Sequence, residues 1–429
     1  MKYFSTADRS NRASFKEAVI KGLPSDNGLY MPEYIPKLSR NFFDELPNIS
    51  LSQIAYEVLL PFVQADLTKS ELQTITEETF AFPIPLKRVS DDIYSLELFH
   101  GPTCAFKDVG ARFLARCMSH FALGQDKKVT VLVATSGDTG SAVANGFLGV
   151  ENVEVVILYP SKKVSHIQEQ QLTTLGQNIK ALEVEGTFDD CQRLVKTAFL
   201  DKELNQTMQL TSANSINIAR LLPQSIYYHS AIAQLKSKDV IVSVPSGNFG
   251  NLTAGLIAKA MGLPVKHFIA ATNRNDIVPN YLETGEFKSR PSVTTISNAM
   301  DVGNPSNFPR MQSLFKGSHV EMKSLISGAS FNDDETRQTI KSVKKNQNYV
   351  LDPHGAIGYS ALSEYLNNNK GTGVFLETAH PAKFIDVMEK LVGDIAIPTQ
   401  LQEYLYKEQK STLIPNSFEE LKSFLLAIE

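Results

Sequence analysis

The sequence of 429 residues predicts an α/β protein with two doubly wound halves. Three observations lead to this fold class. Apolar, β-branched runs of strand length, such as 129–134 and 239–245, alternate with segments of helical spacing. Glycine-rich and hydroxyl-rich turns stand where a strand should end and a helix begin. A hydrophobic content of 42% in a chain of this length can fill a core divided over two or three domains.

The first alternating segment begins near residue 91. Its predicted strands are 129–134, 153–159 and 179–184, and its predicted helices are 140–147, 165–175 and 188–200. Strands that alternate with helices in this way are typical of a parallel sheet with right-handed crossovers.

The second alternating segment repeats the pattern. Its predicted strands are 239–245, 265–271 and 373–377, with a helix at 252–260. Residues 284–309 are rich in Ser, Asn, Gly and Pro and should form a long loop near a ligand.

We expect three regions: a mainly helical N-terminal region 1–90, a first α/β half 91–235, and a second half with the C-terminal region, 236–429. Open α/β sheets bind ligands beyond the carboxyl ends of their strands, so a cleft between the halves is expected.

Composition excludes several classes of partner. A net charge of −4 and a pI near 6.1 do not indicate the positively charged surface that binds nucleic acid. The N-terminus lacks the apolar core of a signal peptide, and no apolar stretch is long enough to span a bilayer, so we expect a cytoplasmic protein without membrane contact. The three cysteines should be free thiols, and the scattered histidines predict no metal site. A monomer or weak homodimer is expected.

Lys107 is the first candidate catalytic residue. It stands in the run from Leu98 to Asp108, next to Ala105, Phe106 and Val109. An amine whose pKa is lowered by burial can form a Schiff base with an aldehyde cofactor.

A glycine-rich turn is the second candidate feature, between the predicted strand 239–245 and the predicted helix 252–260. Free N–H groups at a helix N-terminus favour a phosphate, and glycines allow close approach. An isolated turn of this kind is as often a packing device as a ligand site. With Lys107, however, it indicates a pyridoxal phosphate site. The residues of the turn are Ser246, Gly247, Asn248, Phe249, Gly250 and Asn251.

Two polar clusters could hold the substrate. One follows the strand 129–134 and offers hydroxyls and N–H groups to a carboxylate, or forms an N-cap cluster. The other, if helical, places Asn214, Asn217 and Arg220 broadly on one side, suited to a phosphate or carboxylate, with helix capping as the alternative. Thr378 follows the last buried strand, where a hydroxyl could meet a pyridine nitrogen. The first cluster consists of Thr135, Ser136, Gly137, Asp138 and Thr139.

These motifs, in this order, resemble the threonine synthases of the branch found in bacteria and fungi. The resemblance runs essentially from end to end. It is carried by the segments 28–32, 99–103, 105–108, 134–140, 214–217, 246–250 and 378–383.

The resemblance implies a fold type II pyridoxal phosphate enzyme, tryptophan synthase β-like, that converts O-phospho-L-homoserine and water into L-threonine and phosphate. By motif match, Lys107 is the Schiff-base lysine, the turn 247–251 holds the cofactor phosphate and Thr378 faces the pyridine nitrogen. The cluster 135–139 is expected at the substrate carboxylate. Asn214, Ser215 and Arg220 are expected at the substrate phosphate.

Asp138 is unusual, because an ionised aspartate beside a substrate carboxylate is repulsive unless a cation or the protonated imine offsets it.

Two kinds of rival function are considered. One is another activity of the same fold type, such as a serine or threonine dehydratase or a phosphohomoserine-like lyase without threonine product. The other is a non-catalytic nucleotide-binding or regulatory module. A second phosphate site disfavours the dehydratase. The nucleotide-binding module is disfavoured because the chain contains neither G-x-G-x-x-G nor G-x-x-x-x-G-K-[ST].

Overall fold

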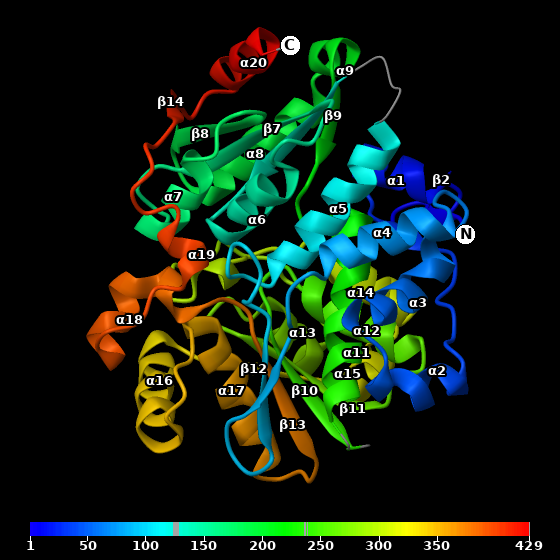
Figure 1. Cartoon of the computed structure of the whole chain (residues 1–429), viewed down its shortest axis with the longest axis vertical. Helices are drawn as coiled ribbons and strands as arrows, with labels where there is room; N and C mark the ends of the chain where they lie inside the picture. The colour runs from blue at the N-terminus through cyan, green and yellow to red at the C-terminus, as the bar shows by residue number, and fades with distance from the viewer. Residues whose placement is uncertain (123–127, 236, 238, 429) are drawn as a thin grey trace.

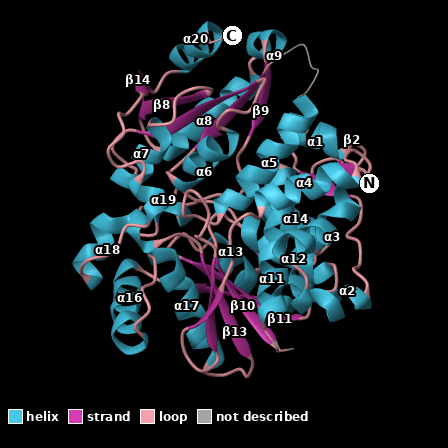
Figure 2. Cartoon of the chain, viewed as in Figure 1, coloured by secondary structure: helices cyan, strands magenta, loops and turns pink. Residues whose placement is uncertain are grey.

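Two sheets with helices on both faces form the frame of the molecule (Figures 1 and 2). The computed structural model describes residues 1–122, 128–235, 237 and 239–428. None of the helices in these ranges is long and apolar enough to cross a membrane.

The five-stranded sheet is parallel throughout, in the order β14-β8-β7-β6-β9, and lies in the upper half of Figure 1. Alternate residues of each central strand point to opposite faces. Val131 and Val155 pack with α5 and α6, whereas Leu132 and Val156 pack with α8 and α20. The elements are β6 (Val129–Ala134), β7 (Val153–Pro160), β8 (Ile179–Glu185), β9 (Gln209–Ser212), β14 (Ser411–Pro415), α5 (Lys107–Ala122), α6 (Asp138–Phe147), α7 (His166–Thr173), α8 (Phe188–Leu200), α9 (Lys202–Thr207) and α20 (Phe418–Ala427).

The six-stranded sheet has the order β12-β11-β10-β13-β5-β4, and only the edge strand β4 is antiparallel to its neighbour. Helices α11 and α12 belong to the core on one face, and α16 and α17 to the core on the other. The strands are β4 (Leu86–Arg88), β5 (Ile93–Glu97), β10 (Val240–Pro245), β11 (Val265–Thr272), β12 (Ile326–Ser330) and β13 (Thr372–Glu377). The helices are α10 (Ile218–Leu221), η2 (Leu222–Gln224), α11 (Ser225–Gln234), α12 (Gly250–Ala260), α13 (Ile277–Thr284), η3 (Asn298–Met300), α14 (Phe308–Leu314), α15 (His319–Leu325), α16 (Asp333–Gln347), α17 (Pro353–Leu366), η4 (Pro381–Phe384), α18 (Ile385–Val392) and α19 (Thr399–Gln402).

The N-terminal region packs against both halves (Figure 1). It combines a small antiparallel sheet with helices, and α4 contacts α5 while α3 contacts α11. Its apolar residues belong to the same core as those of the two large sheets. The elements are β1 (Tyr3–Ser5), β2 (Arg12–Ala13), α1 (Phe15–Lys21), β3 (Tyr30–Pro32), α2 (Arg40–Glu45), η1 (Leu46–Asn48), α3 (Leu51–Val63) and α4 (Lys69–Thr79).

Each strand and helix predicted from the hydrophobic pattern is present, with bounds that differ by no more than a few residues. The strand pairing, however, crosses the expected domain boundaries. β5 precedes the first sheet in sequence but pairs with β13, and β14 follows the second sheet but pairs with β8. The division at residues 90 and 235 stays a prediction, and residues 236 and 429, at the limits of its third region, lie outside the described residues.

Helix α20 follows the second sheet in sequence but packs in the core of the five-stranded sheet, and its contribution to stability can be predicted. Leu421 of α20 is fully buried against the β8 side of that sheet, so Leu421→Ala should lower the free energy of unfolding by about 2–4 kcal/mol. Leu426 on the same helix is 36% exposed, and Leu426→Ala should cost less than about 1 kcal/mol. Urea unfolding of both variants tests this, and equal losses would contradict it.

Candidate active site

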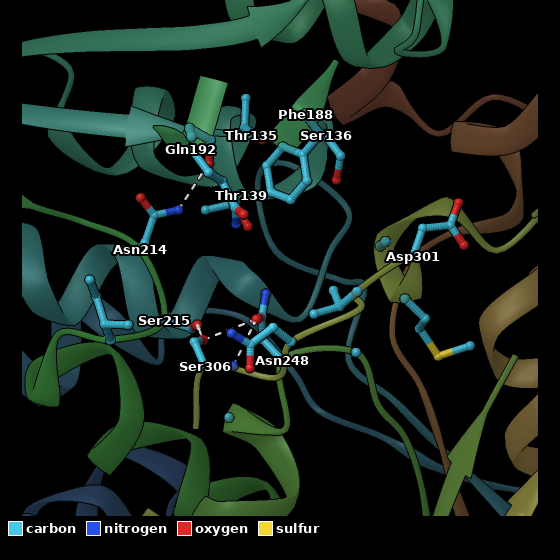
Figure 3. A pocket seen from close by; sticks show the side chains of 18 of the residues that line it. Thr135, Ser136, Thr139, Phe188, Gln192, Asn214, Ser215, Asn248, Asp301 and Ser306 are labelled. Carbon is cyan, nitrogen blue, oxygen red and sulfur yellow. Dashed lines mark hydrogen bonds between the residues drawn. The ribbon is translucent and has the colours of Figure 1, made fainter. Parts of the chain in front are cut away.

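A cavity of about 630 Å³ opens between the two sheets, at the carboxyl ends of β6 and β10. Figure 3 shows Thr135, Ser136 and Thr139 on one side of it, and Ser215, Asn248 and Ser306 facing them from the other. Every candidate site residue from the sequence lines this cavity except Gly137 and Asn217. Gly137 lies between Ser136 and Asp138 in the backbone of the same turn. The site is therefore where doubly wound sheets are expected to bind ligands.

Lys107 is the first residue of α5 and its Nζ atom lies 3.8 Å from Oδ2 of Asp138. The N–H of the preceding residue, Phe106, donates to the carbonyl of Thr378 at 2.8 Å, and the hydroxyl of Tyr227 donates to the carbonyl of Phe106. Burial lowers the pKa of Lys107 to about 8, although the carboxylate of Asp138 opposes the shift. An amine of this pKa has a larger neutral fraction near physiological pH than an ordinary lysine, and the neutral form is the one that forms a Schiff base.

The glycine turn 246–251 is suited to an anion. Phe249 precedes α12 in the left-handed conformation, with φ of 59°, and no side chain caps the N-terminus of that helix. The side-chain Nδ2 of Asn251 is buried and has no hydrogen-bond partner among the described residues. A Cβ atom on Gly247 would lie 2.8 Å from Cα of Met300, so a larger residue would displace the loop that closes this side of the cavity. Uncapped N–H groups and an unpartnered amide fit the phosphate of pyridoxal phosphate.

Thr378 directly follows β13 and lines the same cavity. An isolated antiparallel bridge joins Ala105 to Ala379, so the segment after β13 is held against the segment that carries Lys107. This bridge places the predicted partner of the pyridine nitrogen and the predicted Schiff-base lysine in one cavity.

The turn 135–139 has two functions. The hydroxyl oxygen of Thr135 accepts hydrogen bonds from the N–H groups of Gly137 at 2.9 Å and Gly140 at 2.8 Å, so Thr135 is a structural cap as well as a lining residue. Ser136 and Thr139 are partly exposed and their hydroxyls are available to a ligand (Figure 3). Gly137 has φ of 132°, a conformation that favours glycine.

Asp138 is buried and is neutralised by a residue that had no predicted role. Nζ of Lys383 lies 2.9 Å from Oδ1 of Asp138, and the amide of Gln168 donates to the same oxygen at 2.9 Å. Burial would raise the pKa of Asp138, but the two lysines on either side outweigh it and hold that pKa well below its usual range. Asp138 is therefore ionised, and Lys383 is the cation that offsets its charge. The motif 378–383 contains Lys383, but only the fold shows its partner.

Of the two alternatives for the segment 214–220, helix capping is confirmed for Asn217, and a helix with Asn214, Asn217 and Arg220 on one side is not formed. Helix α10 begins at Ile218, and Asn217 is its N-cap, with its amide donating to the carbonyls of Val19 and Ser212. The side-chain oxygen of Asn217 accepts from the free N–H of Ala219 at 3.1 Å, so the helix begins after residue 217 and does not include Asn214. Asn214 still lines the cavity and donates to the carbonyl of Ala134 at 2.9 Å (Figure 3).

Arg220 is buried and makes no ion pair within the part of the chain that the structure describes. One guanidinium nitrogen donates to the carbonyl of Ala213, while Nε is buried without a partner. Burial lowers the pKa of Arg220 to about 10, so the side chain stays charged near neutral pH. A buried cation that lines a cavity and lacks a counter-ion is suited to bind an anionic ligand group.

The loop 284–309 contributes lining residues that were not predicted individually. Ser306 donates to Oδ1 of Asn248 at 3.0 Å, and Asn307 donates to the hydroxyl of Ser215 at 3.3 Å. Asp301 and His354 complete this side of the cavity. The amino-acid composition of residues 284–309 predicted a loop near the site, but it could not distinguish these lining residues from other polar residues of the loop.

Comparison with known proteins first defines the class. A family model described as "Pyridoxal-phosphate dependent enzyme" matches residues 79–375, so the chain is a pyridoxal phosphate enzyme. Models for the threonine synthase N terminus and C-terminal region match residues 2–80 and 355–425.

Individual relatives define the family. Threonine synthase from Haemophilus influenzae is 46% identical over 99% of this chain and 100% of its own length. The crystal structure of threonine synthase from Escherichia coli superposes with a TM-score of 0.94 at 43% identity, covering 100% of both chains. A pyridoxal phosphate-bound threonine synthase from Brucella melitensis has a TM-score of 0.92 at 35% identity, covering 99% of this chain and 98% of its own. The chain belongs to the threonine synthase family.

The contact between Lys107 and Asp138 can be tested by chemical labelling of the cofactor-free protein. Lys107 should react with an amine-selective reagent with a midpoint near pH 8. Asp138→Asn should move this midpoint to lower pH, because the carboxylate that stabilises the charged amine is lost while Lys383 remains. Asp138→Asn/Lys383→Met removes both charges and should return the midpoint toward that of the wild type. A midpoint unmoved by Asp138→Asn would contradict this account.

Proposed function

We propose that this chain converts O-phospho-L-homoserine and water into L-threonine and inorganic phosphate. The supporting observation is that one cavity contains two separate places suited to phosphate. One is the uncapped start of α12, and the other is Arg220 with its unpartnered Nε. A fold type II enzyme that only dehydrates serine or threonine needs the first place and has no use for the second.

Pyridoxal phosphate, when bound, supplies an electron sink that acidifies the carbon atoms next to the substrate amine. Residues of the turn 247–251 would hold its phosphate and Thr378 would meet its ring nitrogen. Lys107 would hold its aldehyde carbon. Thr378 is neutral, so it would leave the ring nitrogen largely unprotonated.

The chain's own residues then divide the remaining tasks. Ser136 and Thr139 would donate to the substrate carboxylate, and the Lys383–Asp138 pair keeps the charge beside that carboxylate balanced. Lys107, released from the cofactor, would move protons at the substrate Cα and Cβ, since its lowered pKa suits both protonation states near neutral pH. Arg220, Ser215 and Asn214 would hold the phosphate as it leaves Cγ.

A cytoplasmic location, a monomeric or weakly dimeric state and the absence of nucleic acid partners remain proposals based on composition. They do not affect the assignment of the reaction.

The reaction is tested by following products from O-phospho-L-homoserine. The purified protein should release threonine and phosphate in equal amounts, whereas a dehydratase would release a 2-oxo acid and ammonia. Lys107→Ala should lose turnover by more than about a hundredfold and lose the borohydride-reducible lysine adduct of the cofactor, because the amine at the start of α5 is removed. Wild-type turnover in this variant would rule out the assignment of Lys107.

Arg220→Leu tests the second phosphate place. The variant should lose about 2–3 kcal/mol in kcat/KM for O-phospho-L-homoserine, with near-normal cofactor content, because a charge-assisted contact to the leaving phosphate is removed. Arg193→Leu is the matched control: Arg193 lines the same cavity but is largely exposed and pairs with Asp190, so its loss should cost less than about 1 kcal/mol. An equal effect of both substitutions would show that Arg220 has no specific role.

A further inference from the structure

Arg310 is a fully buried arginine that lies behind the cavity, on α14. All three of its guanidinium nitrogens donate. Nε and Nη2 donate to the carbonyl of Tyr30 at 3.2 and 3.0 Å, and Nη1 donates to the carbonyl of Ser215 at 3.2 Å and to Oδ1 of Asn307 at 2.8 Å. Nη2 also donates to the carbonyl of Ile216 at 2.6 Å. The side chain therefore joins the N-terminal region to the turn that precedes Arg220.

No carboxylate of the described residues forms an ion pair with Arg310. Burial alone lowers the pKa of Arg310 to about 9, with no neighbouring charge to offset the cost, and the guanidinium still carries its charge near neutral pH. A buried, unpaired charge costs several kcal/mol, and neutral carbonyls offset only part of this cost. Arg310 and Arg220 together make this end of the cavity positive before any ligand is bound.

The contacts of Arg310 also set the direction of the hydrogen bonds beside it. Because Oδ1 of Asn307 faces the guanidinium, Nδ2 of Asn307 must face the hydroxyl of Ser215, to which it donates at 3.3 Å. The hydroxyl oxygen of Ser215 is thus an acceptor, and its hydrogen is left to donate. Ser306, 3.4 Å away, uses its own hydrogen for Asn248. The hydrogen of Ser215 is therefore available to Ser306 or to an anion in the cavity (Figure 3).

We propose that Arg310 is a positioning residue for substrate phosphate: through Asn307 and the backbone of 215–216 it aims the hydroxyl of Ser215 as a donor into the cavity. This inference rests on the proposed function, since it names the part of the fold that prepares the second phosphate place. It also connects the N-terminal region to the site, because the carbonyl of Tyr30 accepts hydrogen bonds from Nε and Nη2 of Arg310.

The decisive variant is Asn307→Asp in the holoenzyme. Aspartate supplies Arg310 with a counter-ion, so thermal stability should be equal to or above that of the wild type. It cannot donate to Ser215, so that hydroxyl must turn to donate to the aspartate instead of to a ligand. The affinity for inorganic phosphate, measured by calorimetry, should fall about tenfold, and KM for O-phospho-L-homoserine should rise by a similar factor with a smaller change in kcat.

Two further variants complete the experiment. Arg310→Lys keeps the charge but cannot contact Tyr30, Asn307 and Ser215 together, so phosphate affinity should again fall about tenfold. Arg116→Lys is the matched control, because Arg116 of α5 donates to the carbonyl of Gly146 and pairs with Glu78, outside the cavity lining; its phosphate affinity should be that of the wild type.

Wild-type phosphate affinity in folded Asn307→Asp, or in folded Arg310→Lys, would overturn the proposal. A purely structural role predicts a change in melting temperature without a change in phosphate affinity. Should the wild type bind phosphate but not turn over O-phospho-L-homoserine, the proposed reaction fails, and the binding measurements still decide the role of Arg310.

Discussion

The site depends on an interaction between three buried charged residues: Asp138 lies between Lys383 and Lys107. Lys383 follows β13 of one sheet, whereas Asp138 begins α6 on the other, so the ion pair at 2.9 Å fastens the two halves together at the floor of the cavity. Removing either end would leave an uncompensated charge in a buried place, which costs several kcal/mol. The same pair sets the electrostatic surroundings of Lys107, and therefore links the packing of the halves to the reactivity of the amine.

Two buried arginines, one lining the cavity and one behind it, have the opposite character. Arg220 and Arg310 are both buried and make no ion pair among the described residues, and the N-terminus of α12 has no side-chain cap. Positive groups held in fixed positions before binding need little reorganisation when an anion arrives. Among the carboxylates that line the cavity, that of Asp138 is matched by a buried lysine, Lys383. This distribution of charge favours the binding of two phosphate groups, one from the cofactor and one from the proposed substrate.

The most accurate sequence predictions concern residues whose environment is local. The strand Val129–Ala134 and the helix Phe188–Leu200 have the bounds expected from their hydrophobic pattern, and Lys107 and the turn after β10 line one cavity as predicted. The sequence left two alternatives open at residues 214–220, because asparagine suits both a helix face and a helix N-cap. In the structure Asn217 is the N-cap, and its amide also donates to the distant carbonyl of Val19.

The sequence by itself determined the fold class, the order of strands and helices, and the position of the glycine turn between a strand and a helix, because hydrophobic period and turn composition act over a few residues. Only the tertiary structure decided which sheet receives β5 and β14, which cation neutralises Asp138, and what surrounds Arg310. Each of these is a pairing between segments far apart in the chain. Such pairings depend on the packing of whole layers, and no local pattern in the sequence specifies the partner.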